Sequence, residues 1–115
     1  MEAFMRKFIV WSMAGLLLGV GILAAPSVSQ AQEGKQLFSV KCAACHGENG
    51  KGDGPLAKNF DPRPRDFCLP EFWQGDVDKK ISDAVIKGKG QMVPVKLSPE
   101  ELKAVTAFIK SSCKR

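Results

Sequence analysis

At 115 residues, with 44% hydrophobic residues and a formal net charge of +5, the chain has room for one folded domain. The lysines are spread along the sequence and do not alternate with aromatic residues, which argues against nucleic acid as a partner. The sequence contains no internal repeat and no low-complexity tract, so neither a repeat array nor a biased tract is expected.

The first 31 residues have the order of segments found in an export signal. Arg6 and Lys7 precede an uncharged apolar run over residues 8–25, and small residues follow up to Ala31. This order predicts a secretory signal peptide cleaved after Ala31, with an uncleaved membrane anchor as the alternative, because such a run can also span a bilayer. In either case the charges before the run predict a periplasmic or otherwise exported location for the remainder.

Residues 32–115 are expected to form the folded domain, and they offer little material for a core. They hold 31 of the 51 hydrophobic residues in the chain, and 15 Lys and Arg against 11 Asp and Glu, a balance of +4. A domain of this size usually needs a disulfide, a metal or a large bound cofactor to be stable.

Hydrophobic spacing predicts three helices and no strands, so the domain is expected to be all-α. The helices cover about residues 33–42, 77–87 and 98–112. Each has one apolar face of residues spaced three and four apart. These residues are Gly34, Leu37 and Phe38 in the first helix, Ile81, Ala84 and Val85 in the second, and Leu102, Val105, Phe108 and Ile109 in the third.

Local signals mark the ends of the second and third helices. Gly88 can end the second helix. Ser98 as N-cap, Pro99 at the first helical position and Glu101 three residues after Ser98 form a capping box that begins the third. Between the first two helices, residues 47–76 form an irregular stretch rich in Gly and Pro, and a stretch of this length in so small a domain needs something to wrap around.

The end of the first helix carries the sequence Cys42-Ala43-Ala44-Cys45-His46, the C-x-x-C-H pattern of c-type haem attachment. Two cysteines at this spacing can each form a thioether with a haem vinyl group, and the histidine that follows can ligate the iron. The alternatives are a thioredoxin-like redox motif and half of a zinc site. The first lacks the βαβ setting of such motifs, and the second lacks further ligands, since the chain has only one histidine.

The sixth ligand of the iron follows by elimination. A second histidine is impossible, and three of the four methionines lie in the predicted leader, so Met92 is the only thioether in residues 32–115. It lies in residues 88–94, a segment containing Gly and Pro that can bring its sulfur to the iron. The competing interpretations are Lys89, Lys96, water or an open position.

Two cysteines remain outside the motif, Cys68 and Cys113. In an oxidising compartment they can pair and tie the long irregular stretch to the end of the last helix. Two free thiols are the alternative, because separation along the sequence does not give a distance in space.

Along nearly its whole length, the part of the chain after the predicted leader resembles the exported mono-haem class I c-type cytochromes of bacteria. In family members Met commonly precedes Pro directly, whereas here Val93 separates Met92 from Pro94. The matching segments are residues 42–46, residues 47–54 followed by Pro55, residues 88–94 and residues 98–112.

This resemblance implies the cytochrome c fold, in which three or more short helices wrap around one covalent haem. It implies that Gly34 and Phe38 of the first helix cross Phe108 of the last. It also implies that Pro55 offers its carbonyl to the ring nitrogen of His46 that does not bind iron, which would fix the ring and raise its basicity.

A further stretch, residues 61–67, is similar to a Pro-Arg-Asp-Phe stretch in some bacterial members of the family. The likeness implies that Arg63 or Arg65, together with Trp73, approaches the haem propionates, because a guanidinium fork suits a carboxylate. Solvated arginines on a loop are the alternative.

An iron held by both His46 and Met92 has no open position for a substrate, which predicts one-electron transfer and no enzymatic activity. The alternatives are a haem subunit of a larger oxidoreductase and a small-ligand-binding or peroxidase-like haem protein. The expected partners are a redox donor and acceptor with acidic docking surfaces, with membrane contact only if the leader is retained. The lysines expected to steer them are Lys41, Lys51, Lys89 and Lys96.

Overall fold

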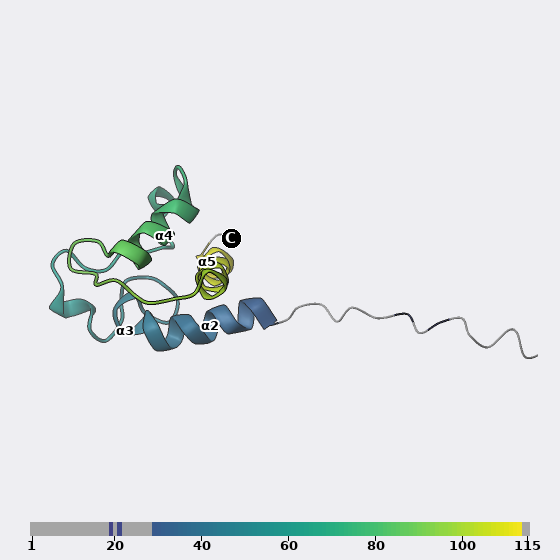
Figure 1. Cartoon of the computed structure of the whole chain (residues 1–115). Helices are drawn as coiled ribbons and strands as arrows, with labels where there is room; N and C mark the ends of the chain where they lie inside the picture. Colours follow the sequence, from purple (N-terminus) through teal and green to yellow (C-terminus); the bar gives the residue numbers. More distant parts are fainter. Residues whose placement is uncertain (1–18, 20, 22–28, 114–115) are drawn as a thin grey trace, which may run out of the picture.

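The computed structural model describes residues 19, 21 and 29–113 of the chain (Figure 1). Its elements are α2 Ser29–Lys41, α3 Ala43–His46, the 3-10 helices η1 Ala57–Asn59 and η2 Pro70–Trp73, α4 Val77–Lys87 and α5 Pro99–Cys113. Within these residues no strand forms, and the one bridge pairs Lys89 with Met92. The predicted all-α fold is confirmed.

Most of the predicted leader, residues 1–31, lies outside the described residues. None of the helices described has the length and apolar character to cross a bilayer.

The signals at the helix ends act as predicted. The amide of Gly88 donates to the carbonyl of Ala84 at 3.0 Å and α4 ends there. At the start of α5 the Ser98 amide donates to a Glu101 carboxylate oxygen at 2.8 Å, and the Glu101 amide donates to the Ser98 hydroxyl at 3.1 Å. These reciprocal bonds are a capping box, which satisfies two amides that the helix itself leaves without partners.

The start of α2 differs from the predicted one, whereas α4 begins at Val77, as predicted. Helix α2 begins at Ser29, four residues before the predicted start. Hydrophobic spacing misses this first turn because three of its four residues are polar. Helix α4 begins with an Asp76 cap, whose carboxylate accepts from the Lys79 amide at 3.0 Å. Spacing of apolar residues does not detect either feature.

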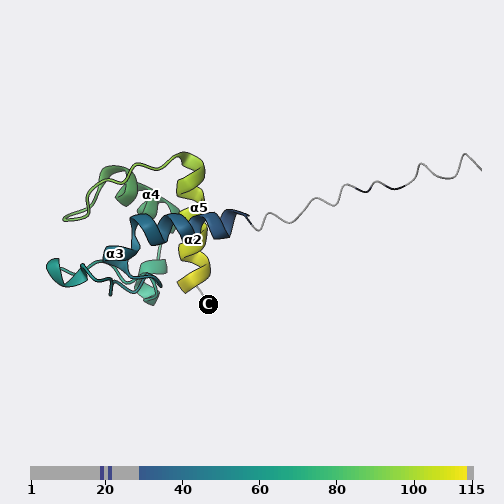
Figure 2. The same cartoon turned by 90° about the horizontal axis from the view of Figure 1, so that it is seen from below.

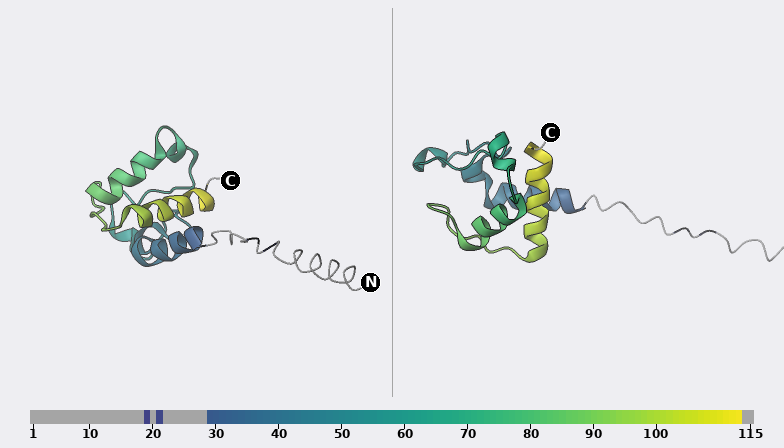
Figure 3. Two further views of the ribbon diagram at one scale, coloured as in Figure 1. Left: turned by 45° about the vertical axis from the view of Figure 1, so that its right-hand side comes forward. Right: turned by 90° about the horizontal axis from the view of Figure 1, so that it is seen from above.

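Helices α2 and α5 lie across each other, and their backbones come very close (Figures 2 and 3). A Cβ atom added at Gly34 would lie 2.1 Å from the carbonyl oxygen of Ala104. Beside this contact the rings of Phe38 and Phe108 lie 5.2 Å apart between centroids. The predicted crossing of Gly34 and Phe38 with Phe108 is therefore confirmed, and Ala104 is the small partner that lets the helices approach.

The core is small, as the composition predicts. Helix α4 contributes the buried side chains of Ile81 and Val85 to it. On the surface, an ion pair of 2.6 Å joins Lys110 of α5 to Asp78 of α4. Because this pair is exposed, its contribution to stability is slight. The buried apolar residues described are Phe38, Ala43, Ala57, Phe67, Phe72, Val77, Ile81, Val85, Ala104, Val105 and Ile109.

A disulfide joins Cys68 to Cys113, across 45 residues of sequence. It ties the irregular stretch between α3 and α4 to the last residue of α5. Of the two alternatives that the sequence leaves open, the structure supports pairing. Closing a segment of this length restricts the unfolded chain, and such a cross-link typically contributes about 2–4 kcal/mol to stability.

The helix crossing predicts that Gly34→Ala destabilises the protein. The new methyl group has no space beside the Ala104 carbonyl, so the helices must separate, and we expect the free energy of unfolding to fall by about 2 kcal/mol. The better helix propensity of alanine acts in the opposite direction. Denaturant unfolding followed by circular dichroism measures the change. Gln36→Ala, at an exposed position of α2, is the matched control, and equal stability of the two variants would contradict the prediction.

Candidate haem-attachment site

One helical turn brings together the two cysteines and the histidine of the C-x-x-C-H motif. The amides of Cys45 and His46 both donate to the carbonyl of Cys42, at 3.2 and 2.9 Å. Cys42 and Cys45 are both half-buried free thiols, in contrast to the paired Cys68 and Cys113. The turn therefore presents two thiols and an imidazole from adjacent positions of one short element.

The glycine-rich loop after α3 folds back onto this turn and holds it. Amides of the loop donate to the free carbonyls at the end of α3: Gly52 to His46 at 2.7 Å, Gly54 to Cys45 at 3.2 Å and Leu56 to Ala44 at 2.8 Å. A Cβ atom at Gly54 would lie 2.4 Å from the Ala44 oxygen, so only glycine allows this approach. The loop thereby satisfies the carbonyls that a helix end leaves without partners.

The chemical state of Cys42 does not suit thiol–disulfide exchange. Burial raises the pKa of its thiol to about 11, with Cys45 adding to the rise and Lys41 opposing it. Redox dithiols work through a thiolate whose pKa is lowered by its surroundings. The raised pKa of Cys42 therefore argues against a thioredoxin-like redox role.

His46 is held by two neighbours from the loop that precedes η2. Its Nδ1 lies 3.4 Å from the backbone oxygen of Arg65, and its ring stacks on Phe67 with centroids 4.7 Å apart and planes 21° from parallel. Burial lowers the pKa of His46, and the Arg65 hydrogen bond opposes that shift. The imidazole is therefore neutral at neutral pH, and with Nδ1–H directed at Arg65 its Nε2 keeps a lone pair for a metal.

The partner of Nδ1 differs from the one that the resemblance implied. The Arg65 carbonyl takes the position assigned to the Pro55 carbonyl. The physical reason is the path of the loop, since the backbone next to Pro55 is bound to α3 by the bond from Leu56 to Ala44. Sequence reasoning missed Arg65 in this role, because every residue carries a backbone carbonyl.

Met92 lies on a separate loop that is anchored on both sides. The backbones of Lys89 and Met92 exchange two hydrogen bonds of 3.0 Å, which close a tight turn, and Val95 donates to Val85 of α4 at 2.8 Å. The Met92 side chain is half-buried against the hydrophobic core, as is that of Cys42. The loop also reaches across the molecule, because the Gln91 side-chain oxygen accepts from the amide of Asp61 at 3.1 Å.

The residues present fit a c-type haem. Two thiols are free, one imidazole has an available Nε2, and one thioether is partly exposed at the border of the core. Several apolar side chains at this border remain incompletely buried, and a large apolar group laid over them would remove their surface from water. They include Met92, Val95 and Leu97.

Trp73, Arg63 and Arg65 were expected to approach the haem propionates. The indole N–H of Trp73 donates to the Phe67 carbonyl at 2.8 Å, so this donor is already used within the chain. Arg63 and Arg65 are exposed, and their approach to haem propionates stays a prediction. No three His, Cys, Asp or Glu side chains in the described residues are grouped as a metal site would require.

Helix α2 leads into the C-x-x-C-H turn, and α5 crosses α2 at Gly34 and Phe38, an arrangement that is typical of c-type haem proteins. Comparison with known families agrees: the cytochrome c family model matches residues 31–112. The chain therefore belongs to the cytochrome c family and is a class I c-type cytochrome. Membership implies a covalently bound c-type haem with its iron, and electron transfer as its use.

A similar protein is the cbb3-type cytochrome c oxidase subunit FixP of Azorhizobium caulinodans, 35% identical over 92 residues. The alignment covers 75% of this chain but only 29% of FixP. The chain thus spans less than a third of the relative that it matches.

The site predicts which cysteines carry the covalent bonds. Cys42→Ala combined with Cys45→Ala leaves no thiol on the α3 turn, so we expect complete loss of covalently bound haem from protein made in a host that matures c-type cytochromes. Haem staining after denaturing electrophoresis, together with intact mass, measures this. Cys68→Ala combined with Cys113→Ala is the control with the same number of cysteines removed, and it should keep the haem. Stained haem in the first variant would show that the attachment site is elsewhere.

Proposed function

We propose that this chain is a one-electron carrier with a single covalent haem, attached through Cys42 and Cys45 and ligated by His46 and Met92. The observation that carries the proposal is the α3 turn, where two free thiols and a neutral imidazole are adjacent and the loop amides hold them in place. The bound haem would supply an iron that changes between the ferric and ferrous states.

The two ligands have separate tasks in this proposal. His46 is oriented by the Arg65 carbonyl and by the face of Phe67, and so presents Nε2 in a defined direction. Met92 supplies a thioether, which favours the ferrous state more than a second imidazole would and so raises the midpoint potential. With both positions filled, a substrate has no place to bind, which is why we propose a carrier and not an enzyme.

Export fits the same function. The predicted leader and the Cys68–Cys113 disulfide both favour an oxidising location outside the cytoplasm, which we take to be the periplasm.

A second candidate function is that of a haem subunit within a larger oxidoreductase. The observation that favours it is the 35% identity to a cbb3-type cytochrome c oxidase subunit, whose length is more than three times the matched part. In that case the chain would pass electrons only inside an assembly. Size-exclusion chromatography of gently solubilised native cells distinguishes the two, since a carrier elutes at the size of one small domain and a subunit elutes with an oxidase. A small-ligand-binding or peroxidase-like function would require Met92 to leave the iron.

Ligation by Met92 predicts a specific loss in Met92→Ala. The weak absorption band at the red end of the oxidised spectrum, which reports sulfur on iron, should disappear, and the midpoint potential should fall because the thioether no longer favours ferrous iron. Optical spectroscopy and a redox titration measure both effects. Val93→Ala, at the exposed neighbouring position, is the control and should leave both unchanged. An unchanged red band in Met92→Ala would reject Met92 as the ligand.

The lysines of the Met92 loop predict attraction of negatively charged partners. Lys89 and Lys96 are exposed, so Lys89→Glu with Lys96→Glu should slow oxidation of the reduced protein by ferricyanide, an anionic probe, by about 2- to 10-fold at low ionic strength. The difference should shrink at high salt, because exposed charges are screened. Stopped-flow absorbance measures the rate. Lys35→Glu with Lys103→Glu, at exposed positions of α2 and α5, makes the same change in net charge, and an equal effect would mean that only net charge matters.

A further inference from the structure

The segment of residues 65–68 is the part of the long loop that touches His46. Its first residue contributes the carbonyl oxygen 3.4 Å from Nδ1, and Phe67 contributes the ring that stacks on the imidazole. Whatever fixes this segment therefore fixes two of the surfaces against which His46 rests.

Hydrogen bonds anchor the segment at its centre. The amide of Phe67 donates to Gly50 at 2.7 Å, and its carbonyl accepts from the indole of Trp73 at 2.8 Å. The Phe67 ring is buried, with Phe72 at 4.9 Å and Phe38 at 6.4 Å between centroids. Phe67 thus connects His46 to the hydrophobic core.

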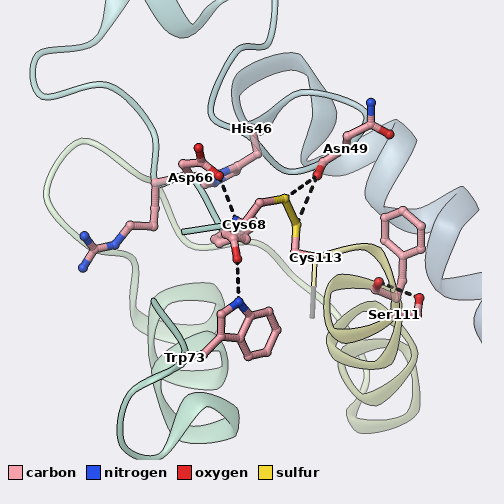
Figure 4. Close-up of a disulfide and its surroundings, with 10 residues drawn as sticks. His46, Asn49, Asp66, Cys68, Trp73, Ser111 and Cys113 are labelled. Carbon is pink, nitrogen blue, oxygen red and sulfur yellow. Dashed lines mark hydrogen bonds between the residues drawn. A yellow bond between two sulfur atoms is a disulfide. The ribbon is translucent and has the colours of Figure 1, made fainter. Parts of the chain in front are cut away.

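The disulfide anchors the same segment at its end (Figure 4). Cys68 directly follows Phe67 and is bonded to Cys113, the last residue of α5. The two sulfur atoms lie 3.5 and 3.3 Å from the backbone oxygen of Asn49, which is three residues after His46. The disulfide therefore lies where the loop after α3, the segment 65–68 and the end of α5 meet.

We propose that the Cys68–Cys113 disulfide is a positioning element for His46, an inference that rests on the proposed ligation of iron by this residue. Helix α5 is locked across α2 at Gly34, and α2 leads into the turn that carries His46. The disulfide joins the other end of this system to the segment that touches the imidazole. It thereby completes a closed path from the histidine through Phe67, Cys68, α5 and α2 back to the histidine.

The physical reason for such an element is the irregularity of the long loop. Between α3 and α4 the chain forms only two short 3-10 helices, and loops of this kind sample more conformations than the elements they connect. Without the cross-link, the Arg65 carbonyl and the Phe67 ring would vary in position against His46. A ligand held by such contacts loses its fixed orientation when they loosen.

The test uses the ferric, haem-bearing full chain with Cys68→Ala and Cys113→Ala. Proton NMR of the four haem methyl groups reports the orientation of the axial imidazole, and hydrogen exchange of the Phe67 amide reports the anchoring of the segment. We expect a changed order or spread of the methyl shifts and at least about tenfold faster exchange at Phe67. Val105→Ala is the control, because Val105 is 1% exposed in the core on α5 and its truncation destabilises the fold without removing the cross-link.

A second variant tests whether the disulfide acts through Phe67. Phe67→Leu removes the stacked ring and leaves the disulfide, and it should change the methyl shifts in its own right. If the disulfide acts through this residue, removing it in the Phe67→Leu background should produce a smaller further change than in the parent.

The outcomes separate this inference from the proposed function. Haem methyl signals that are present and identical in the parent and the cysteine variant would overturn the positioning role alone. A change equal to that in Val105→Ala would also overturn it, because the disulfide would then only stabilise the fold as a whole. A parent chain that carries no covalent haem would overturn both.

Discussion

The contact between Gly34 and the backbone of Ala104 is the constraint on which the rest of the structure depends. It lets α2 and α5 cross closely enough for Phe38 and Phe108 to pack beside the contact. Helix α2 leads into the turn that carries Cys42, Cys45 and His46, and α5 ends at the disulfide. Because so few apolar residues are available, this single crossing organises most of the core that the chain can build.

Around this crossing the irregular parts of the chain are used to hold functional groups. The glycine-rich loop gives its amides to the carbonyls of the attachment turn, and the segment at residues 65–68 gives a carbonyl and a ring to His46. The loop carrying Met92 is closed by its own turn and by the bond from Asp61 to Gln91. Stretches without regular structure thus have defined backbone hydrogen bonds, in agreement with the requirement that buried polar backbone groups find partners.

Much of this arrangement could be predicted from the sequence, where the type and spacing of residues indicate a specific local structure or chemistry. The Ser98 and Glu101 capping box, the glycine at the helix crossing and the C-x-x-C-H motif all belong to that class. The polar start of α2 was not predictable, since nothing apolar marks it, and neither was Arg65, whose contribution is a backbone oxygen. The sequence could not decide whether Cys68 and Cys113 form a disulfide or stay as free thiols, because their distance in space depends on the completed fold.

The four cysteines of this chain are in two different chemical states. Cys68 and Cys113 are joined in a disulfide, whereas Cys42 and Cys45 are free and, in the proposed function, would react with the haem vinyl groups. The raised pKa of Cys42, about 11, leaves almost no thiolate there to attack a neighbouring sulfur. Burial of Cys42 therefore disfavours attack by this thiol on another sulfur once the chain has folded.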